Sequence, residues 1–581
     1  MSSKPYLLRW TAKVELSKKI QDPLGLYGLK FFEQHFLPGI TTQTERLRYF
    51  SFLTWAWKKI MDEKLSWQKI LDMEKILVLV AAYHHYNHSN YPKGIRNMGD
   101  AINFISKHEV IDVDEFRNFG RNNKIGYGNY YYKGPLAELR ILWCEDDNIR
   151  LSSVGMKIAN TLDNLSHKKN IFLRKRFSKL ELSNLHPYCF CEEMITEDEK
   201  EIWRLVFFGF TKFTEDGDLL IDDVSYQNFN QGEIEPIPKL DIISDLQNGH
   251  FSQLSIEISQ EAPNVDLQKL AKRNLWRRYT LFLILKIVEE AKPNVNNLNQ
   301  TIRDAIYYKQ IYIDDNCVKN INFGKLEKIR EYWEVYIHNL YYISAFELIF
   351  KIFLDIIKQK PLGTTLDEVI SSFNIMEVRD SIIKYGIIVE NQDFDINEVD
   401  ENIRYLFRGK KTSLESYLNE RNLILEYANL KSYNERIANL LMLLLLLRYR
   451  YKSFNNEQKD ALSYIEKMSD LSSLRPSHVY SSILNGKISD FIRNIFSLVK
   501  NRHKYVASKK YYYSNTRAWL FTEEDDVIYF YGRDYRVNIY REAKWRNVVE
   551  LLIDMKLIKK KDSTFILSEV GKEWIGKIMS T

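Results

Sequence analysis

GITTQTERLRYFSFLTWAWKKI, residues 39–60, is the most densely specified stretch of this chain. Thr42 stands three residues before Glu45, and at this spacing each side chain can accept a hydrogen bond from the backbone N–H of the other residue. The pair therefore predicts a capping box at the start of a helix. Apolar residues then recur at three- and four-residue steps, and further aromatic residues widen the apolar surface: Leu47, Tyr49, Phe50, Phe52, Leu53, Trp55, Trp57 and Ile60. This pattern predicts a helix that is embedded between neighbouring elements.

Two arginines, Arg46 and Arg48, lie in the first turns of this predicted helix. The helix dipole does not favour a cation at that end. Two explanations stay open. Either the guanidinium groups have a functional role, or each of them pairs with an acidic residue of a neighbouring helix.

The composition indicates a large globular protein. A chain of 581 residues exceeds what one hydrophobic core holds, so three or four folding units are expected. Hydrophobic residues make up 45% of it and there are only 12 prolines, which leaves little room for disorder. Four cysteines exclude a disulfide scaffold and indicate a reducing compartment: Cys144, Cys189, Cys191 and Cys317. The first residues lack a signal pattern and the longest apolar run, 437–447, is too short for a bilayer, so we expect a cytoplasmic protein without membrane association.

One local order of residues occurs twice. IRLSSVGM at 149–156 aligns with FILSEVGK at 565–572, and each follows a predicted helix and turn. This order resembles the second half of a winged-helix unit. Between the two stretches, long helices without internal proline or glycine are expected at 275–288, 331–359 and 423–447. The predicted fold class is mainly α, a multi-helix bundle with N-terminal and C-terminal winged-helix-like units.

Four domains are predicted from these patterns. Residues 1–165 would form an N-terminal helical and winged-helix-like domain, and 166–265 a helical segment with an irregular insertion. The insertion is placed at 214–248, which is acidic, contains glycine and proline, and shows little periodicity. Residues 266–495 would form a central helical bundle, and 496–581 a basic C-terminal winged-helix-like domain.

Positive charge is concentrated near the C-terminus. The net charge of +6 cannot by itself indicate nucleic-acid binding. Residues 500–561, however, contain fifteen Lys and Arg against eight Asp and Glu, and tyrosines interleave with the cations at 502–513. A smaller basic set precedes the first winged-helix-like stretch, and Arg546 and Lys559–Lys561 occupy the helix and wing positions that meet DNA in winged helices. The predicted nucleic-acid-binding residues are Arg502, Lys504, Lys509, Lys510, Arg517, Arg546, Lys559, Lys560, Lys561, Arg121 and Lys133. The alternative is a solvated basic face, or one that docks an acidic protein partner.

Three groups of residues approach a metal-site pattern. His84 and His88 would share a helix face, but His85 stands where a two-histidine zinc helix carries glutamate, so helix-terminal histidines are expected. His186, Cys189 and Cys191 could supply three zinc ligands, but no second cysteine pair closes a four-ligand site, so buried reduced thiols are expected.

Asp241 and Glu257 come nearest to the carboxylate pair of a metal-dependent nuclease, but Ser259 and Gln260 stand where a lysine is needed. No phosphate-binding loop, dinucleotide-binding motif or nucleophile elbow occurs in the sequence. We therefore assign no catalytic residue, metal or cofactor.

GITTQTERLRYFSF at 39–52, YYKGPLAEL at 131–139 and the closing winged-helix order together resemble a group of uncharacterised prokaryotic proteins associated with anti-phage defence loci. The resemblance implies a cytoplasmic subunit that acts with other proteins on foreign DNA. The expected function is a DNA-binding sensor or scaffold subunit of an anti-phage defence complex, without catalysis of its own, with double-stranded DNA and other protein subunits as partners. Two alternatives stay open: a protein-interaction scaffold without direct nucleic-acid contact, and a divergent metal-dependent nuclease that uses Asp241 and Glu257.

Overall fold

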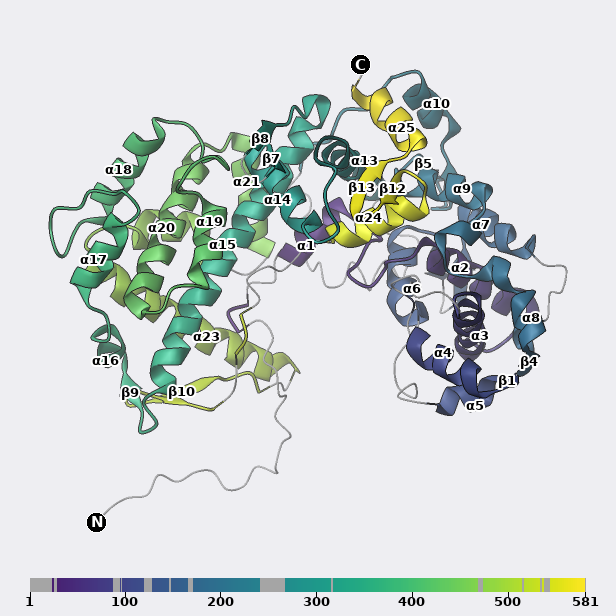
Figure 1. The fold of residues 1–581 in the computed structure, drawn as a ribbon, viewed down its shortest axis with the longest axis horizontal. Helices are drawn as coiled ribbons and strands as arrows, with labels where there is room; N and C mark the ends of the chain where they lie inside the picture. The colour runs from purple at the N-terminus through teal and green to yellow at the C-terminus, as the bar shows by residue number, and fades with distance from the viewer. Residues whose placement is uncertain are drawn as a thin grey trace, which may run out of the picture. The chain divides into compact units, whose positions relative to one another are not determined.

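The described part of the chain forms two compact units (Figure 1). We call residues 30–334 and 542–581 the hairpin unit, and residues 1–29 and 335–541 the bundle unit. Helices dominate both, and every sheet among the described residues has two or three strands, so the prediction of a mainly α fold is confirmed. The computed structural model describes residues 23–25, 29–86, 95, 97–119, 128–145, 148–165, 171–240, 267–314, 317–468, 474–514, 517–532, 535–537 and 544–579.

None of the described helices combines the length and the apolar character that crossing a membrane requires.

The bundle unit is built around the apolar helix α20 (Tyr433–Lys452), whose run from Ile437 to Leu447 is completely buried. The helices α17 (Ile375–Ile383), α18 (Ile396–Phe407) and α19 (Glu420–Tyr427) pack against it. The other elements are α15 (Glu327–Lys358, from residue 335), α16 (Leu366–Ile370), α21 (Asn456–Met468), α22 (Pro476–His478), η5 (Val479–Ile483), α23 (Ile488–Ser514) and a sheet of β9 (Thr364–Thr365), β10 (Phe521–Glu524) and β11 (Val527–Phe530).

One expected helix of this unit is in fact two. The single helix predicted over 423–447 is wrong, because α19 ends at Tyr427 and α20 begins at Tyr433. Ser432 accepts from the Glu435 amide while the Glu435 carboxylate accepts from the Ser432 amide, a capping box that starts a new helix. The predicted helices at 275–288 and 331–359 lie within α13 and α15, apart from the last residue of the second.

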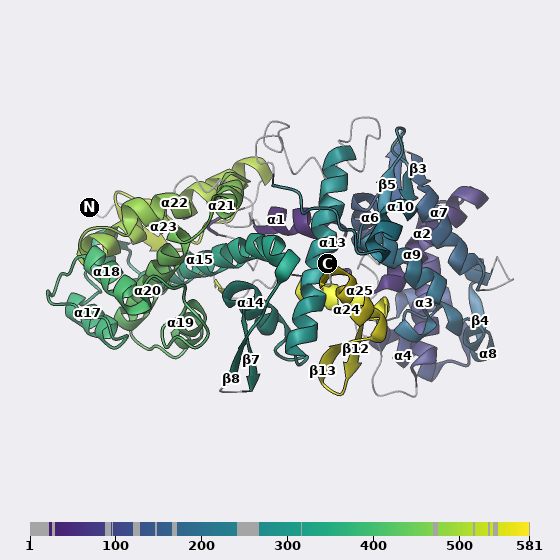
Figure 2. The ribbon, with the colours of Figure 1, turned by 90° about the horizontal axis from the view of Figure 1, so that it is seen from above.

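The hairpin unit contains the remaining elements. They are α1 (Leu29–Phe36), α2 (Leu47–Glu63), α3 (Gln68–His84), α4 (Met98–Lys107), β1 (Val110–Asp112), α5 (Val113–Asn118), α6 (Gly128–Glu138), β2 (Leu142–Glu145), β3 (Asn148–Leu151), α7 (Ser153–Asp163), η1 (Ile171–Leu173), β4 (Arg176–Ser178), α8 (Lys179–Ser183), η2 (His186–Tyr188), η3 (Glu192–Met194), α9 (Glu197–Phe207), β5 (Thr211–Phe213), β6 (Leu219–Ile221), α10 (Asp223–Asn230), α13 (Leu267–Ala291), α14 (Leu298–Tyr308), β7 (Gln310–Asp314), β8 (Cys317–Asn320), η4 (Gly324–Leu326), α24 (Trp545–Asp554), β12 (Ile558–Lys561), β13 (Thr564–Leu567) and α25 (Glu569–Met579). The long helix α13 contacts β5, β7 and β13, and the β7–β8 and β12–β13 hairpins project toward the same edge of the view in Figure 2.

The helix α2 is buried along most of its length, which confirms the prediction that it is embedded between neighbours. Its predicted capping box, Thr42 with Glu45, is wrong, because α2 begins at Leu47 and its cap residue, Arg46, makes no side-chain capping bond. Instead the Leu47 amide donates to the buried Asp554 carboxylate at 2.8 Å. A carboxylate at the end of α24 thus takes the place of a local cap.

A helix leads through an antiparallel hairpin into another helix four times in the described residues of the hairpin unit. The four sets are α6–β2–β3–α7, α9–β5–β6–α10, α14–β7–β8–α15 and α24–β12–β13–α25. In each set one residue with a left-handed backbone separates the first helix from its strand: Arg140 (φ 58°), Gly209 (φ 63°), Lys309 (φ 58°) and Lys556 (φ 57°). The prediction of an irregular insertion at 214–248 is wrong over 219–230, because β6 and α10 form there and complete the second set. Residues 241–248 lie outside the described part.

The shared order of 149–156 and 565–572 has a physical reason. Ser152 Oγ accepts from the Gly155 amide and Ser568 Oγ from the Gly571 amide, each at 3.0 Å, so both serines cap the helix that follows the hairpin. A Cβ atom added at Gly155 would lie 2.7 Å from the Ile141 carbonyl oxygen, and one at Gly571 would lie 2.0 Å from that of Leu557. Both glycines are therefore needed because a helix start and the first strand approach closely.

Candidate nucleic-acid interface and a histidine–cysteine cluster

The β12–β13 hairpin presents three exposed lysines on a buried apolar base. Lys559 pairs with Ile566, Lys560 with Phe565 and Lys561 with Thr564 across the hairpin. Ile558, Phe565 and Leu567 are buried, which anchors the strands. The edge of β13 is also held, because the Phe565 amide donates to the Pro293 carbonyl at 2.9 Å and the Val295 amide to the Ser563 carbonyl at 2.9 Å. The lysines therefore stand on a hairpin that is held by its buried base and along the edge of β13.

These lysines differ from neighbouring lysines in forming no ion pair among the described residues. Lys556, Lys572 and Lys577 pair with Glu197, Glu569 and Glu573 at 2.9, 2.9 and 2.7 Å. Lys559, Lys560 and Lys561 are exposed and form no ion pair with any residue that the structure describes, and the same holds for Arg546 in the first turn of α24. The hairpin and the start of α24 thus carry exposed positive charge that no ion pair among the described residues holds, and Glu569 acts on Lys559 only at longer range.

The predicted DNA-contacting residues on α23, and Arg517 just after it, differ in burial and in their partners. Arg502 is buried and donates to the Leu24 carbonyl at 2.9 Å, so its guanidinium stabilises the bundle unit. Lys504 pairs with Glu523 at 2.6 Å. The Lys509 ammonium lies 5.9 Å from the centre of the Tyr505 ring, and Lys510 and Arg517 are half-buried.

Four tyrosines on α23 are exposed, most of all Tyr512 (82%) and Tyr513 (75%), followed by Tyr505 and Tyr511. Their aromatic faces therefore reach solvent beside Lys504 and Lys509, as the interleaved sequence predicted. All of these residues belong to the bundle unit, whereas Arg546 and Lys559–Lys561 belong to the hairpin unit. The basic stretch 500–561 is therefore divided between the two units.

Of the smaller N-terminal set, Lys133 is half-buried, and its ammonium lies 5.5 Å from the centre of the Trp57 ring. Arg121 lies outside the described residues, as do His88, Asp241 and Glu257. The structure therefore adds nothing to the nuclease alternative.

Arg46 and Arg48 both pair with buried acids, which confirms the second explanation for them. Arg46 lies 2.7 Å from the Asp554 carboxylate, and Arg48 lies 3.2 Å from that of Glu199. Burial raises the pKa of Asp554 to about 7, although Arg46 acts in the opposite direction. Both guanidinium groups also donate to carbonyls of the segment 187–194: Arg46 to Phe190 at 3.2 Å, and Arg48 to Pro187 at 3.0 Å and to Met194.

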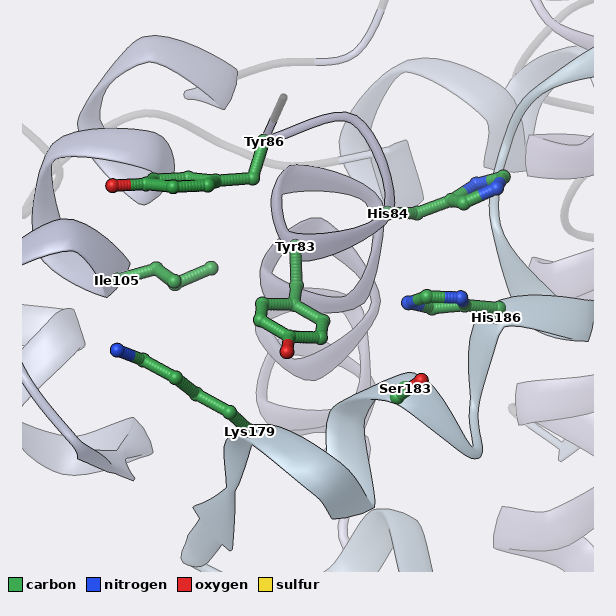
Figure 3. A pocket seen from close by; sticks show the side chains of 7 residues that line it. All are labelled: Tyr83, His84, Tyr86, Ile105, Lys179, Ser183 and His186. Atoms are coloured by element: carbon green, nitrogen blue, oxygen red, sulfur yellow. The ribbon is translucent and has the colours of Figure 1, made fainter. Parts of the chain in front are cut away.

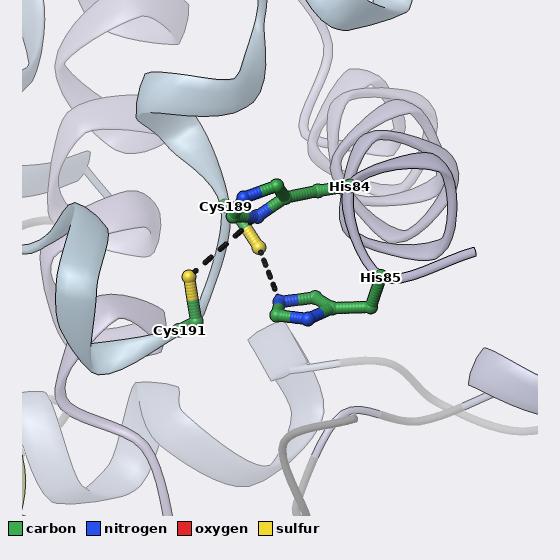
Figure 4. A group of neighbouring side chains, drawn as sticks. All are labelled: His84, His85, Cys189 and Cys191. Atoms are coloured by element: carbon green, nitrogen blue, oxygen red, sulfur yellow. Dashed lines mark hydrogen bonds between the residues drawn. The ribbon is translucent and has the colours of Figure 1, made fainter. Parts of the chain in front are cut away.

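That segment carries half of a histidine–cysteine cluster (Figure 4). His85 Nε2 lies 3.5 Å from Cys189 Sγ, and His84 Nδ1 lies 3.7 Å from Cys191 Sγ. One potential ligand atom of each residue lies within 4.8 Å of the other three. Both cysteines are buried. The interaction between the two thiols, together with burial, raises the pKa of Cys189, and the same interaction lowers the pKa of Cys191.

The sequence shows the two halves of this cluster but does not show that they meet. The pair that completes Cys189 and Cys191 is a histidine pair about a hundred positions earlier, at the end of α3. For the histidine half of the cluster, the only local sequence signal is that His84 and His85 are adjacent. His84 and His85 stand at the C-terminal end of α3, so the expectation of helix-terminal histidines is confirmed for these two, and His88 lies outside the described residues.

A pocket of about 440 Å³ lies beside the cluster (Figure 3). His84 and His186 lie on one side of it, with ring centres 4.6 Å apart, and Tyr86, Ile105 and Lys179 lie on the other. Neither cysteine lines the pocket. A molecule in the pocket would therefore meet imidazole rings rather than sulfur.

Comparison of the chain with protein-family models, with curated proteins and with solved structures gave no match. The function is therefore argued from the residues of the chain itself.

Proposed function

We propose that this chain is a cytoplasmic subunit that binds double-stranded DNA through the β12–β13 hairpin and α24, as a sensor or scaffold of a prokaryotic anti-phage defence complex and without catalysis of its own. The observation that carries the DNA proposal is the exposure of Lys559, Lys560 and Lys561, which form no ion pair with a described residue. The defence context rests on the sequence resemblance alone.

The order of helix, hairpin and helix fits a winged-helix-like mode of binding. In that mode the helix before the hairpin enters a groove and the hairpin lies along the backbone. Lys559 and Lys561 project from the same face of β12, because alternate strand residues share a face. Their Cα atoms are about 7 Å apart along the strand. Their ammonium groups would neutralise phosphates of one DNA backbone, while Arg546 contacts the duplex from the first turn of α24. Affinity would then come mainly from phosphates, with little sequence preference from the hairpin.

Salt-dependent binding to labelled duplex DNA tests this proposal. In the triple variant K559A/K560A/K561A we expect weaker binding to all sequences alike, and a plot of log affinity against log salt that is flatter by about three. The matched control is K319A/K572A/K577A, which removes the same charge from lysines that already pair with Glu290, Glu569 and Glu573. The control should bind as the unaltered chain does. Equal DNA affinity and equal salt slope in the two variants would remove the hairpin assignment.

A second candidate is a protein-interaction scaffold without direct nucleic-acid contact. It is favoured by the exposed tyrosines of α23, since tyrosine is enriched at protein interfaces. The DNA titration separates the two candidates. Absence of binding at low salt would favour the scaffold, and cleavage in the presence of magnesium or manganese would instead favour the nuclease alternative.

A further inference from the structure

Two sulfur–nitrogen separations in the histidine–cysteine cluster match those of a tetrahedral zinc site. Zinc lies about 2.3 Å from a thiolate and about 2.0–2.1 Å from an imidazole nitrogen, which places sulfur and nitrogen about 3.5 Å apart in a tetrahedron. The two measured sulfur–nitrogen separations are 3.5 and 3.7 Å. We propose that His84, His85, Cys189 and Cys191 bind one zinc ion.

The chemistry of the donor atoms selects the metal. Calcium and magnesium take oxygen ligands, whereas two sulfurs and two imidazole nitrogens in a tetrahedron suit zinc. Two thiolates cancel the charge of a divalent cation, and two neutral imidazoles add none. The loaded site is therefore neutral, which suits the burial of Cys189 and Cys191.

The loop that carries the cysteines is shaped by contacts that do not need the metal. The Met194 amide donates to the Cys191 carbonyl at 3.2 Å, which closes a turn just after the second cysteine. Arg46 and Arg48 hold three carbonyls of the same loop. Such outer contacts orient the loop that carries the metal ligands. The sulfurs are thus placed for a ligand that joins them to the end of α3.

The site is closed, which indicates a structural rather than a catalytic ion. A catalytic zinc keeps a position open for water or substrate, whereas here the protein supplies all four ligands. The neighbouring pocket reaches His84 but neither sulfur. The ion would tie the C-terminal end of α3 to the segment 186–194, two parts of the chain that no disulfide among the described residues links.

Metal content of the purified full-length chain tests the proposal. The chain would be prepared in a reducing buffer with zinc, freed of loosely bound metal by gel filtration, and measured by inductively coupled plasma mass spectrometry. We expect one zinc per chain, loss of zinc in C189S/C191S and in H84N/H85N, and full zinc in two controls. The controls are C317S, an exposed free thiol, and H186N, whose ring lies beside that of His84.

Because ligand variants can fail to fold, the coordination of the unaltered chain supplies a second measurement. X-ray absorption at the zinc edge should give two sulfur and two nitrogen neighbours. A zinc-free chain, a zinc shell without sulfur, or full zinc in C189S/C191S would each overturn the proposal. Loss of zinc in H186N together with retention in H84N/H85N would overturn the assigned ligand set.

Discussion

Arg277 of α13 shows how a buried charge can serve the main chain. Its guanidinium donates to the carbonyls of Phe207 at 2.7 Å, Val206 at 2.8 Å and Pro38 at 3.2 Å. The neighbouring Arg278 donates to Phe208 at 2.6 Å and to Gly209 at 2.7 Å. The last carbonyls of a helix have no partner within it, so the two arginines satisfy the end of α9. Burial lowers the pKa of Arg277 to about 9, which leaves it protonated at neutral pH.

His503 is a buried residue whose protonation should make the stability of the bundle unit depend on pH. Its Nδ1 donates to the Pro23 carbonyl at 3.0 Å and its Nε2 accepts from the Leu520 amide at 3.0 Å, so the neutral ring is held at both nitrogens. Burial lowers its pKa to about 4. The unfolded chain takes up this proton near pH 6.5, before the folded chain does, so stability is fully present above that pH and falls as the pH drops toward 4.

The loss should approach roughly 3 kcal/mol at the acid end of this window. Urea unfolding of the bundle unit between pH 4 and 7, followed by hydrogen exchange of its helices, measures it. In H503Q this part of the pH dependence should disappear, because an amide can donate and accept without titrating. H478Q, at an exposed histidine of the same unit, is the control. An unchanged pH profile in H503Q would contradict the assignment.

Local sequence patterns correctly marked those helix starts that are determined by contacts between neighbouring residues. The Ser-x-x-Gly order at 152–155 and 568–571 marks two helix starts, and its glycines are explained by the carbonyls of Ile141 and Leu557. The start of α2 could not be predicted in this way, since its capping carboxylate, Asp554, lies 507 positions away. The four proposed zinc ligands could not be predicted as one site for the same reason. Each half has a short-range signal, but only the packing of α3 against the segment 186–194 joins them.

The two glycines of α25 allow a paired test of this explanation. In G571A the new Cβ would meet the Leu557 carbonyl at 2.0 Å, so the helix start or the hairpin must shift, at a cost of about 1–3 kcal/mol. In G576A the new Cβ would meet nothing within 4 Å, and the higher helix propensity of alanine should add up to about 1 kcal/mol. Thermal unfolding of the two variants should therefore move in opposite directions. Equal shifts would show that helix propensity alone governs both positions.

The chain folds into two units, and no sequence pattern marks the boundary between them. The basic stretch 500–561 is divided between these units. The mainly α class followed from composition and periodicity, because these are properties of each segment. The division at residues 334 and 541 did not, since the hairpin unit is closed by a C-terminal segment that returns to it. Within that unit the cysteine loop contacts Arg46, Arg46 pairs with Asp554, and Asp554 ends α24. The proposed zinc site and the proposed DNA interface thus share a chain of direct contacts.

Removal of the metal should therefore loosen one unit and spare the other. Ligands that bind only the folded state stabilise it, so a chelator acting on the zinc-loaded chain should lower protection from hydrogen exchange at the end of α3, in the segment 186–194 and in the first turn of α2. A smaller loss is expected at the end of α24, through Arg46 and Asp554. The buried helix α20 of the bundle unit, which has no part in this network, should keep its protection.

C317S treated in the same way should respond as the unaltered chain does. A loss spread evenly over both units would show that the metal supports the folding of the whole chain, and no loss at 186–194 would show that Arg46 and Arg48 hold the cysteine loop without it.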